Sequence, residues 1–330
     1  MSNDTLPYRN ELTSLRSDTT HDWGEGTKGR APHKPFLLLS ILDGIESGWI
    51  TNHQIELSSD LTDTFITYWN AIMGKERITT IALPYYHMQS EPFWRLVYKE
   101  GMKPFSSSPS LGSLQKRVKH AEINSDLFRH FANPQKRDRY RKLLLTTYFN
   151  QETGEVLKDL ISLNRLSYEY SEELLDRVAE PFEKYVAEDA ERYIEQSYKR
   201  QVRDKGFRKA IRRIYKDRCV LCRTKVVTPN DNSLIDGAHI IPWEEKGTDD
   251  PRNGLALCKT HHWMFDSYLL TIQPDYQIKL SGWLKKEGKE IEHTLAWDGK
   301  EIFLPEEERF MPHEEALSER FKRFKEINKN

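Results

Sequence analysis

The chain reads CVLC at residues 219–222 and CKTHH at residues 258–262. Each stretch places two potential zinc ligands three residues apart, because Cys219 pairs with Cys222 and Cys258 pairs with His261. Structural zinc sites usually have four tetrahedral ligands, most often thiolates and imidazoles. A tight turn can aim two of these ligands at one point, so the four residues predict a Cys3His zinc site.

The alternative is that the three cysteines are ordinary small, buried apolar side chains. All three cysteines of the chain take part in the ligand spacing, which favours zinc. Residues 223–257 separate the two pairs, a longer interval than a simple zinc ribbon has. We therefore expect a hairpin and a loop between the two halves of the site.

The interval between the pairs reads as a β-hairpin that leads into a helix. Residues 234–243 (LIDGAHIIPW) indicate a strand that ends in a turn, and residues 253–257 (NGLAL) lead into the second pair. Residues 262–268 continue as a helix. This order places a histidine, an asparagine and a second histidine around one zinc-braced hairpin.

These residues, His239, Asn253 and His262, resemble the signature of the HNH endonuclease family, which has a ββα-metal fold, over roughly residues 215–280. The resemblance implies that His239 is the general base that deprotonates water, a role that suits neutral imidazole near pH 7. It implies that His262 binds a catalytic Mg²⁺ or Mn²⁺ ion and that Asn253 holds the loop that orients His239. The C-x2-H spacing assigns His261 to zinc, which leaves His262 for catalysis.

The sequence departs from the family pattern at one expected metal ligand. Many members carry Asp or His directly before the general base, and this chain has Ala238 there. Asp236 lies on the same face of the expected strand as Ala238, so it could substitute. Asp266 lies four residues after His262 on the same face of the expected helix and is another candidate. The ligand set of the catalytic ion stays open at this stage.

The composition indicates a globular chain without a membrane partner. The 330 residues include 14 Phe, 15 Tyr and 8 Trp, which suffice for real cores although 31% of the residues are charged. The longest apolar run is far too short to cross a bilayer, and the polar N-terminus shows no secretion signal. Cysteines confined to a metal pattern fit a reducing compartment, so we expect a cytoplasmic protein of two or three domains.

Charge is distributed unevenly, although the net charge is only −1. Residues 169–195 hold ten acids and three bases, whereas residues 199–218 hold ten bases and two acids. A basic helix directly ahead of the metal pattern suits DNA phosphates, with Arg208, Arg212 and Arg213 as the expected contacts. The alternative is a solvated helix face that the acidic segment neutralises.

The organisation along the chain predicts an α+β protein with three parts. We expect a mixed α/β DNA-recognition domain over residues 1–150 and a helical connector over residues 151–205. Residues 206–330 are expected to form the endonuclease domain, which ends in an amphipathic helix from Pro312 to Ile327.

Periodicity and breakers predict the elements of the first two parts. Helices are expected from Pro35 to before Gly48, from Leu61 to before Gly74, and over residues 114–148 with a restart at Pro134. A long charged helix is expected over residues 171–200. Two short segments read as strands, residues 78–83 and 93–98.

Two N-terminal stretches carry a second resemblance. Residues 29–39 (GRAPHKPFLLL) and 91–96 (EPFWRL) resemble the sulfur-binding domain of restriction endonucleases that cut phosphorothioate-modified DNA, a domain usually followed by an HNH domain. A non-bridging sulfur is larger, softer and less well hydrated than oxygen, so an apolar pocket can prefer it while cations hold the phosphate charge. The expected DNA contacts are Arg30, His33 and Lys34 for charge and bases, and Pro92, Phe93 and Trp94 for the pocket.

Two features oppose this assignment of pocket residues. Phe93 and Trp94 lie on an expected strand, where aromatic residues are more often core residues. Family members often have an aromatic residue before the Pro-Phe pair, and this chain has Glu91, whose carboxylate repels a phosphorothioate unless it is turned away or paired. Tyr85 or Tyr86 could supply the missing aromatic wall.

The sequence therefore predicts a modification-dependent restriction endonuclease that uses structural Zn²⁺ and catalytic Mg²⁺ or Mn²⁺. Its expected partner is double-stranded DNA, and a homodimer is a reasonable expectation because cutting both strands often needs two active sites. One alternative is the same nuclease reading a methylated base in an aromatic cage. The other is a zinc-stabilised DNA-binding module without catalysis.

Overall fold

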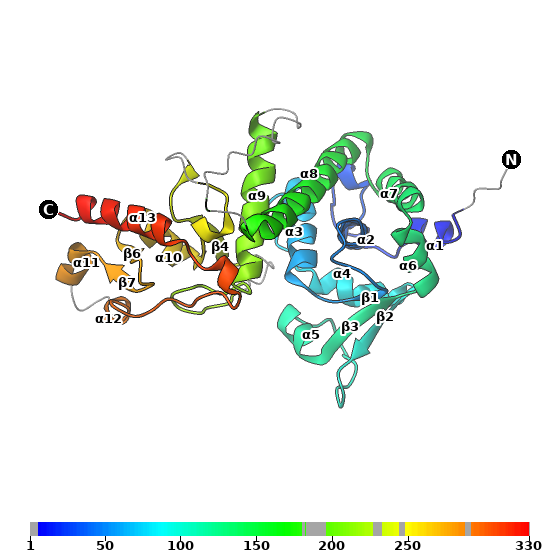
Figure 1. The fold of residues 1–330 in the computed structure, drawn as a ribbon. Helices are drawn as coiled ribbons and strands as arrows, with labels where there is room; N and C mark the ends of the chain where they lie inside the picture. Colours follow the sequence, from blue (N-terminus) through cyan, green and yellow to red (C-terminus); the bar gives the residue numbers. More distant parts are fainter. Residues whose placement is uncertain are drawn as a thin grey trace. The chain divides into compact units, whose positions relative to one another are not determined.

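The computed structural model describes residues 6–179, 182, 196–226, 233–243, 248–287 and 292–329. The chain divides into two compact units, one that ends at Arg165 and one that begins at Leu166. Both units combine helices with short antiparallel sheets (Figure 1), which confirms the α+β class. Within these described ranges, no helix is long and apolar enough to cross a membrane.

The first unit is built around one buried helix. Helix α2 (His33–Glu46) has every residue from Lys34 to Gly44 buried, and other helices of the unit pack against it. A helix that is apolar on all sides belongs in a core. The surrounding helices are α1 (Arg9–Thr13), α3 (Ser59–Met73), α4 (Ala82–His87), α5 (Leu111–Arg117), α6 (Ser125–Ala132), α7 (Pro134–Tyr148) and the start of α8 (Gln151–Asp176), with short 3-10 turns η1 (Glu25–Thr27) and η2 (Met88–Ser90).

A three-stranded antiparallel sheet completes the first unit. Strand β3 (Val118–Ile123) lies in the middle, between β1 (Gln54–Ile55) and β2 (Trp94–Tyr98). Tyr85 of α4 fixes the sheet, because its hydroxyl donates to Ile55 O (2.6 Å) and accepts from Ala121 N (2.7 Å).

Several expected elements of this unit are confirmed. Pro35 lies in the first turn of α2, where its missing N–H is not needed, and Gly48 follows the helix with a φ of 80°. Helix α3 ends at Met73 and is capped by Gly74 at a φ of 81°. Strand β2 occupies the expected strand over residues 93–98 to within one residue.

The strand expected over residues 78–83 is wrong. The segment runs without regular structure to Ile81 and then enters α4 at Ala82. Pro84 lies in the first turn of that helix, where proline is tolerated and where it could not join the interior of a sheet. Ile81 and Ala82 are fully buried, so they anchor a helix start rather than a strand.

The helix expected over residues 114–148 is interrupted. Helix α5 ends at Arg117, and the next residues form β3, the central strand of the sheet. Hydrogen bonding from both neighbouring strands outweighs the helical periodicity of this stretch. The restart at Pro134 is confirmed, since Pro134 is the first residue of α7 and Asn133 caps it.

The second unit contains the hairpin and the helix predicted around the zinc pattern. Strands β4 (Ile235–His239) and β5 (Gly254–Cys258) pair antiparallel, and α10 (Lys259–Asp266) follows β5 directly. Helix α9 (Gln196–Ile214) packs against both strands. Phe207 and Ile211 of this helix are buried, and Ile214 is half-buried.

The rest of the second unit supports this hairpin. A second hairpin joins β6 (Leu270–Ile272) to β7 (Ile278–Leu280). The C-terminal helix is confirmed as α13 (Glu314–Ile327), with Leu317 and Phe324 buried and Phe321 half-buried. The remaining elements are the end of α8, η3 (Arg177–Ala179), η6 (Pro251–Asn253), α11 (Gly282–Glu287), α12 (Glu292–Leu295) and η8 (Glu308–Phe310).

The long charged helix expected over residues 171–200 is described only at its ends. Helix α8 ends at Asp176, and α9 begins at Gln196. Residues 180, 181 and 183–195, which include much of the acidic segment, lie outside the described residues.

Candidate active site and metal centre

Four ligand atoms converge beside the β4–β5 hairpin. The group consists of Cys219, Cys222, Cys258 and His261, and its ligand atoms all lie within 4.8 Å of one another. His261 Nδ1 is 3.2 Å from the Sγ atoms of both Cys219 and Cys258. Cys258 ends β5 and His261 lies in the first turn of α10, so the strand-to-helix junction produces the C-x2-H spacing.

Backbone hydrogen bonds hold the first cysteine pair in place. Arg223 N donates to Cys219 O (2.9 Å) and Cys219 N donates to Thr224 O (3.1 Å), which closes a tight turn. Val220 N donates to Ala256 O (2.9 Å) and so ties this turn to β5. The two ligand pairs therefore meet although residues 223–257 separate them.

The chemistry of the four donors fits a zinc ion. Three thiols and one imidazole in a compact group match the Cys3His class of structural sites. The thiols perturb one another strongly: hydrogen bonding to Cys222 raises the pKa of Cys219, and the same contact lowers the pKa of Cys222. A shared cation would stabilise all of these sulfurs as thiolates. The Trp297 ring covers the group, with its centroid 4.4 Å from that of His261 and the rings edge to face.

His239 ends strand β4 and is held on two sides. Its ring stacks on Phe207 of α9, with centroids 3.8 Å apart and an interplanar angle of 4°. Its Nε2 atom lies 2.8 Å from Oδ1 of Asp249. The imidazole is half-buried, so one edge is fixed while solvent still reaches the side chain.

The close approach of α9 to the hairpin depends on a glycine. Gly254 pairs with His239 across the two strands. A Cβ atom at Gly254 would lie 2.2 Å from Cδ1 of Ile211 and 2.9 Å from Phe207. The absence of a side chain there lets Phe207 pack under the His239 ring.

Asn253 is fully buried and clamps the loop between the two strands. Its Oδ1 atom accepts from Ile241 N (2.9 Å), and its Nδ2 atom donates to Ile241 O (3.0 Å) and Thr248 O (2.8 Å). Its own backbone oxygen accepts from Ile240 N (2.8 Å). One side chain thus joins Ile241, just after β4, to Thr248 in the segment that precedes β5.

Residues 219–273 match the family model described as HNH endonuclease. The chain carries an HNH endonuclease domain. The matched range begins at the first cysteine ligand and contains His239, Asn253 and His262. The metal cluster and the hairpin followed by a helix give this HNH domain the expected frame.

A solved structure titled "Modification dependent TagI restriction endonuclease" is similar to the chain at 21% sequence identity, with a TM-score of 0.27. The similarity covers 36% of this chain and 36% of that one. The comparison with curated proteins gave no match.

Two of the three expected ligands for a catalytic ion lie together in the HNH domain. Nε2 of His262 is 3.4 Å from Oδ2 of Asp266, one turn later on α10. The His262 side chain is half-buried and that of Asp266 is 62% exposed, so both donors reach solvent. An open site with a few protein ligands and water suits a hydrated divalent ion, and the Asp266 carboxylate supplies the oxygen donor that Mg²⁺ and Mn²⁺ prefer.

Asp236 is engaged differently from the other two candidates. It forms ion pairs with Arg208 (2.7 Å to Nε) and with Lys259. Burial favours the neutral acid, but the two cations outweigh it and lower the pKa of Asp236. Asp236 would have to leave both partners to bind an ion. Ala238, the departure from the family pattern, is buried in the apolar core of the unit.

The three arginines expected to contact DNA all form ion pairs within the second unit. Arg208 pairs with Asp236, Arg212 with Asp217 (2.7 Å), and Arg213 with Glu172. Arg212 is also only 8% exposed. Neutralisation by nearby acids therefore accounts for part of this basic segment, and DNA contact by these arginines stays a prediction.

In the first unit, some of the residues expected to contact DNA lie in the hydrophobic core and others lie at the surface. Phe93 and Trp94 belong to the hydrophobic core, at 3% and 4% exposed. Trp94 is fixed there because its Nε1 donates to Tyr85 O (3.1 Å), and Tyr85 is itself fully buried. None of these three aromatic rings can form a surface wall. Pro92 and Arg30 are exposed.

His33 and Lys34 do line a cavity, of about 540 Å³. Its walls combine apolar side chains, including Trp23 and Leu83, with the cationic side chain of Arg16. The full lining is Arg16, Ser17, Asp18, Trp23, Ala31, His33, Lys34, Leu83, Pro84, His87 and Ser90.

The charged groups at this cavity are a buried ion pair and an exposed arginine, beside a neutral imidazole. The carboxylate of Glu91, which the sequence placed near the expected pocket, is buried and paired with Lys34. It also accepts from Arg16 N (3.1 Å), so it does not confront a ligand unpaired. Burial, with the nearby cation Arg77, lowers the pKa of His33 to about 4, so this imidazole is neutral at pH 7. Arg16 is therefore the exposed cation of the cavity.

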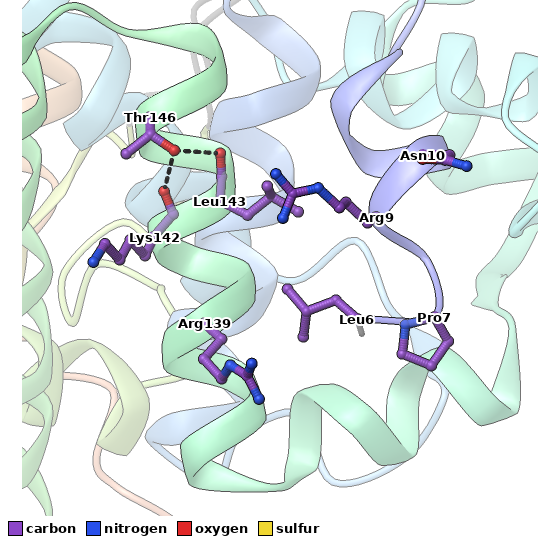
Figure 2. Close-up of a pocket in the computed structure, with 8 residues that line it drawn as sticks. All are labelled: Leu6, Pro7, Arg9, Asn10, Arg139, Lys142, Leu143 and Thr146. Atoms are coloured by element: carbon purple, nitrogen blue, oxygen red, sulfur yellow. Dashed lines mark hydrogen bonds between the residues drawn. The ribbon is translucent and has the colours of Figure 1, made fainter. Parts of the chain in front are cut away.

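A second cavity of about 720 Å³ lies in the first unit between the chain around α1 and helix α7 (Figure 2). Its basic side chains are Arg9, Arg139 and Lys142, and none of the described residues that line it is acidic. This lining suits a phosphate group, which neither resemblance indicated.

Sequence reasoning missed Asp249, Trp23 and Arg16. Each lies in a segment without strong periodicity, and each acquires its role only through contacts distant in sequence. The sequence offered only a weak signal for Asp249, which is an acid four residues before Asn253.

We expect Asn253→Ala to destabilise the HNH domain by about 2–3 kcal/mol, because three buried or partly buried backbone groups would lose their partner. Denaturant unfolding of the full chain would measure the change. Asn253→Asp is the matched variant: it retains an acceptor for Ile241 N but not the two donated bonds. An Asn253→Ala protein as stable as the wild type would contradict the clamp.

Proposed function

We propose that this chain is a metal-dependent DNA endonuclease that hydrolyses phosphodiester bonds with its HNH domain. The observation that carries the proposal is His239, placed at the end of the zinc-braced hairpin and held by Asp249 and Phe207 within the family match. A binding module without catalysis would not need an oriented, partly solvated imidazole at this place.

The proposed mechanism assigns one task to each side chain. His239 accepts a proton from the attacking water. His262 and Asp266 would hold a divalent ion, Mg²⁺ or Mn²⁺, which when bound would stabilise negative charge on the phosphate and the leaving oxygen. Asn253 would hold the loop that follows His239 in place. The Cys3His zinc site would hold the end of β5 and the start of α10 together.

We further propose that the first unit reads a modification on double-stranded DNA, with phosphorothioate as the mark. The cavity that contains His33 and Lys34 supports this assignment, because apolar walls at Trp23 and Leu83 suit a poorly hydrated sulfur. Arg16 at its rim would hold the phosphate charge. We therefore assign recognition of the mark to this cavity instead of to Phe93 and Trp94.

A methylated base is the second candidate mark. The cavity, at about 540 Å³, has room for a flipped base, and the half-buried Trp23 ring could stack on it. The basic cavity with Arg9, Arg139 and Lys142 would contact the DNA backbone under either reading.

Matched DNA duplexes test these proposals with the full chain. One duplex carries a phosphorothioate, one a methylated base and one neither, and both binding and cleavage with Mg²⁺ or Mn²⁺ are measured. We expect preferred binding and cleavage of the phosphorothioate duplex. Arg16→Ala should weaken its binding about tenfold, equivalent to about 1.4 kcal/mol.

Arg129→Ala is the control, since Arg129 is also an exposed arginine of the first unit but lies outside the cavity. It should leave the preference unchanged. Equal affinity for all three duplexes would contradict the reading of a modification. Preference for the methylated duplex would replace phosphorothioate with the second candidate. Absence of metal-dependent cleavage of every duplex would contradict the endonuclease.

A further inference from the structure

Asp249 is a fully buried carboxylate that faces three donors. Oδ1 lies 2.8 Å from Nε2 of His239. Oδ2 accepts from the Tyr170 hydroxyl (2.8 Å) and forms an ion pair with Arg203 at 3.5 Å. Neither resemblance to known families gave this residue a role. A buried acid with such partners is costly unless its charge is used or compensated.

The other partners of Asp249 are a hydroxyl donor and a cation, which suit a carboxylate that accepts hydrogen bonds. Arg203 supplies a positive charge at the buried carboxylate. Burial and the neighbouring Asp249 raise the pKa of Tyr170 above its usual range, so the tyrosine remains protonated and acts as a donor. An ionised carboxylate can only accept hydrogen bonds. Every hydrogen bond to Asp249 must therefore be donated to it.

This constraint decides the tautomer of His239. A neutral imidazole has one protonated nitrogen, and the contact with Asp249 requires that nitrogen to be Nε2. The lone pair is then left on Nδ1, which becomes the proton acceptor. The stacked Phe207 ring fixes the plane of the imidazole, so the direction of the Nδ1 lone pair is fixed as well.

We propose that Asp249 is the positioning residue of the active site, which holds His239 as the Nε2–H tautomer and leaves Nδ1 as the general base. The assignment rests on the proposed nuclease function. Asp249 also stabilises the imidazolium that forms when His239 takes the proton from water. Tyr170 and Arg203 hold the carboxylate in place, and Tyr170 lies in α8, far from the hairpin in sequence.

Asp249→Asn tests the proposal because it keeps the size of the side chain but removes its charge. An asparagine amide can also donate to Nε2 and so favour the opposite tautomer. We expect kcat to fall about 10²–10³-fold with little change in KM, by analogy with other carboxylate–histidine pairs. Asp250→Asn is the matched control: the neighbouring acid pairs with Arg252 instead of His239, so kcat should be nearly unchanged.

A double variant separates positioning from a purely structural role. If Asp249 acts through His239, adding Asp249→Asn to His239→Ala should cause almost no further loss of activity. A further loss as large as in the wild-type background would overturn the proposal. Tyr170→Phe should reduce kcat less than Asp249→Asn, because the carboxylate keeps Arg203 and His239.

Nitrogen-15 NMR of the wild-type chain with labelled histidine provides a readout that does not depend on cleavage. The His239 signals, assigned by their absence in His239→Ala and recorded at a pH where the ring is neutral, should show a proton on Nε2 and none on Nδ1. A neutral ring with its proton on Nδ1 would overturn the positioning role even if the chain cuts DNA. If the chain does not cut DNA but shows the Nε2–H tautomer, the nuclease proposal fails and the Asp249 contact stands.

Discussion

His239→Ala is expected to remove metal-dependent DNA cleavage while DNA binding and the fold remain. The imidazole is the group at the end of β4 that can accept a proton from water, and general base catalysis contributes about 10²–10⁴-fold to such reactions. His239 is half-buried, and its contacts are the stacked Phe207 ring and Asp249. Its removal leaves the hairpin pairing and the zinc ligands unchanged.

The measurement compares cleavage rates at saturating Mg²⁺ or Mn²⁺ for wild type and variant, beside their affinities for the same duplex. Zinc content and the unfolding midpoint report whether the domain is intact. His313→Asn is the control, because it replaces a histidine of the same unit but retains a side-chain acceptor for the cap of α13. A His239→Ala protein that cleaves at the wild-type rate would remove His239 from the mechanism.

The parts of this site that sequence could predict are those with local spacing. The two ligand pairs each occupy a short local segment, and apolar stretches bounded by turn residues indicate the two strands between them. Periodicity also predicted α2 and α3. A glycine at positive φ follows each helix and marks its expected end.

The parts that failed depend on tertiary context. Val118–Ile123 follows a helix without a turn signal and becomes a strand only because two partners flank it. Phe93 and Trp94 resembled pocket residues in sequence, yet the same aromatic character places them in the core. Asp249 and Tyr170 are separated by 79 positions, so no local pattern could pair them.

Removal of zinc is expected to unfold the HNH domain selectively. The zinc-binding free energy of small structural sites is about 10–16 kcal/mol, which equals or exceeds the stability of a typical domain at about 5–15 kcal/mol. Cys258 and His261 define the junction of β5 with α10, and Val220 joins the first cysteine pair to β5. Without the ion, these segments would lose the metal–ligand bonds that join them.

The chain contains an internal control, because all three of its cysteines lie in the second unit. Cys258→Ser, or treatment of the wild type with a zinc chelator, should abolish an unfolding transition and expose amides of β4, β5 and α10 to hydrogen exchange. Protection of α2 and α3 in the first unit should persist.

Acidification should have a similar effect to chelation, because the ligands must be deprotonated and a falling pH favours their release of metal. One zinc per chain is expected in the wild type. A metal-free chain that keeps full protection of α10 would show that apolar packing alone holds the hairpin, and His239 would then owe its position to Phe207 and Asp249 rather than to zinc.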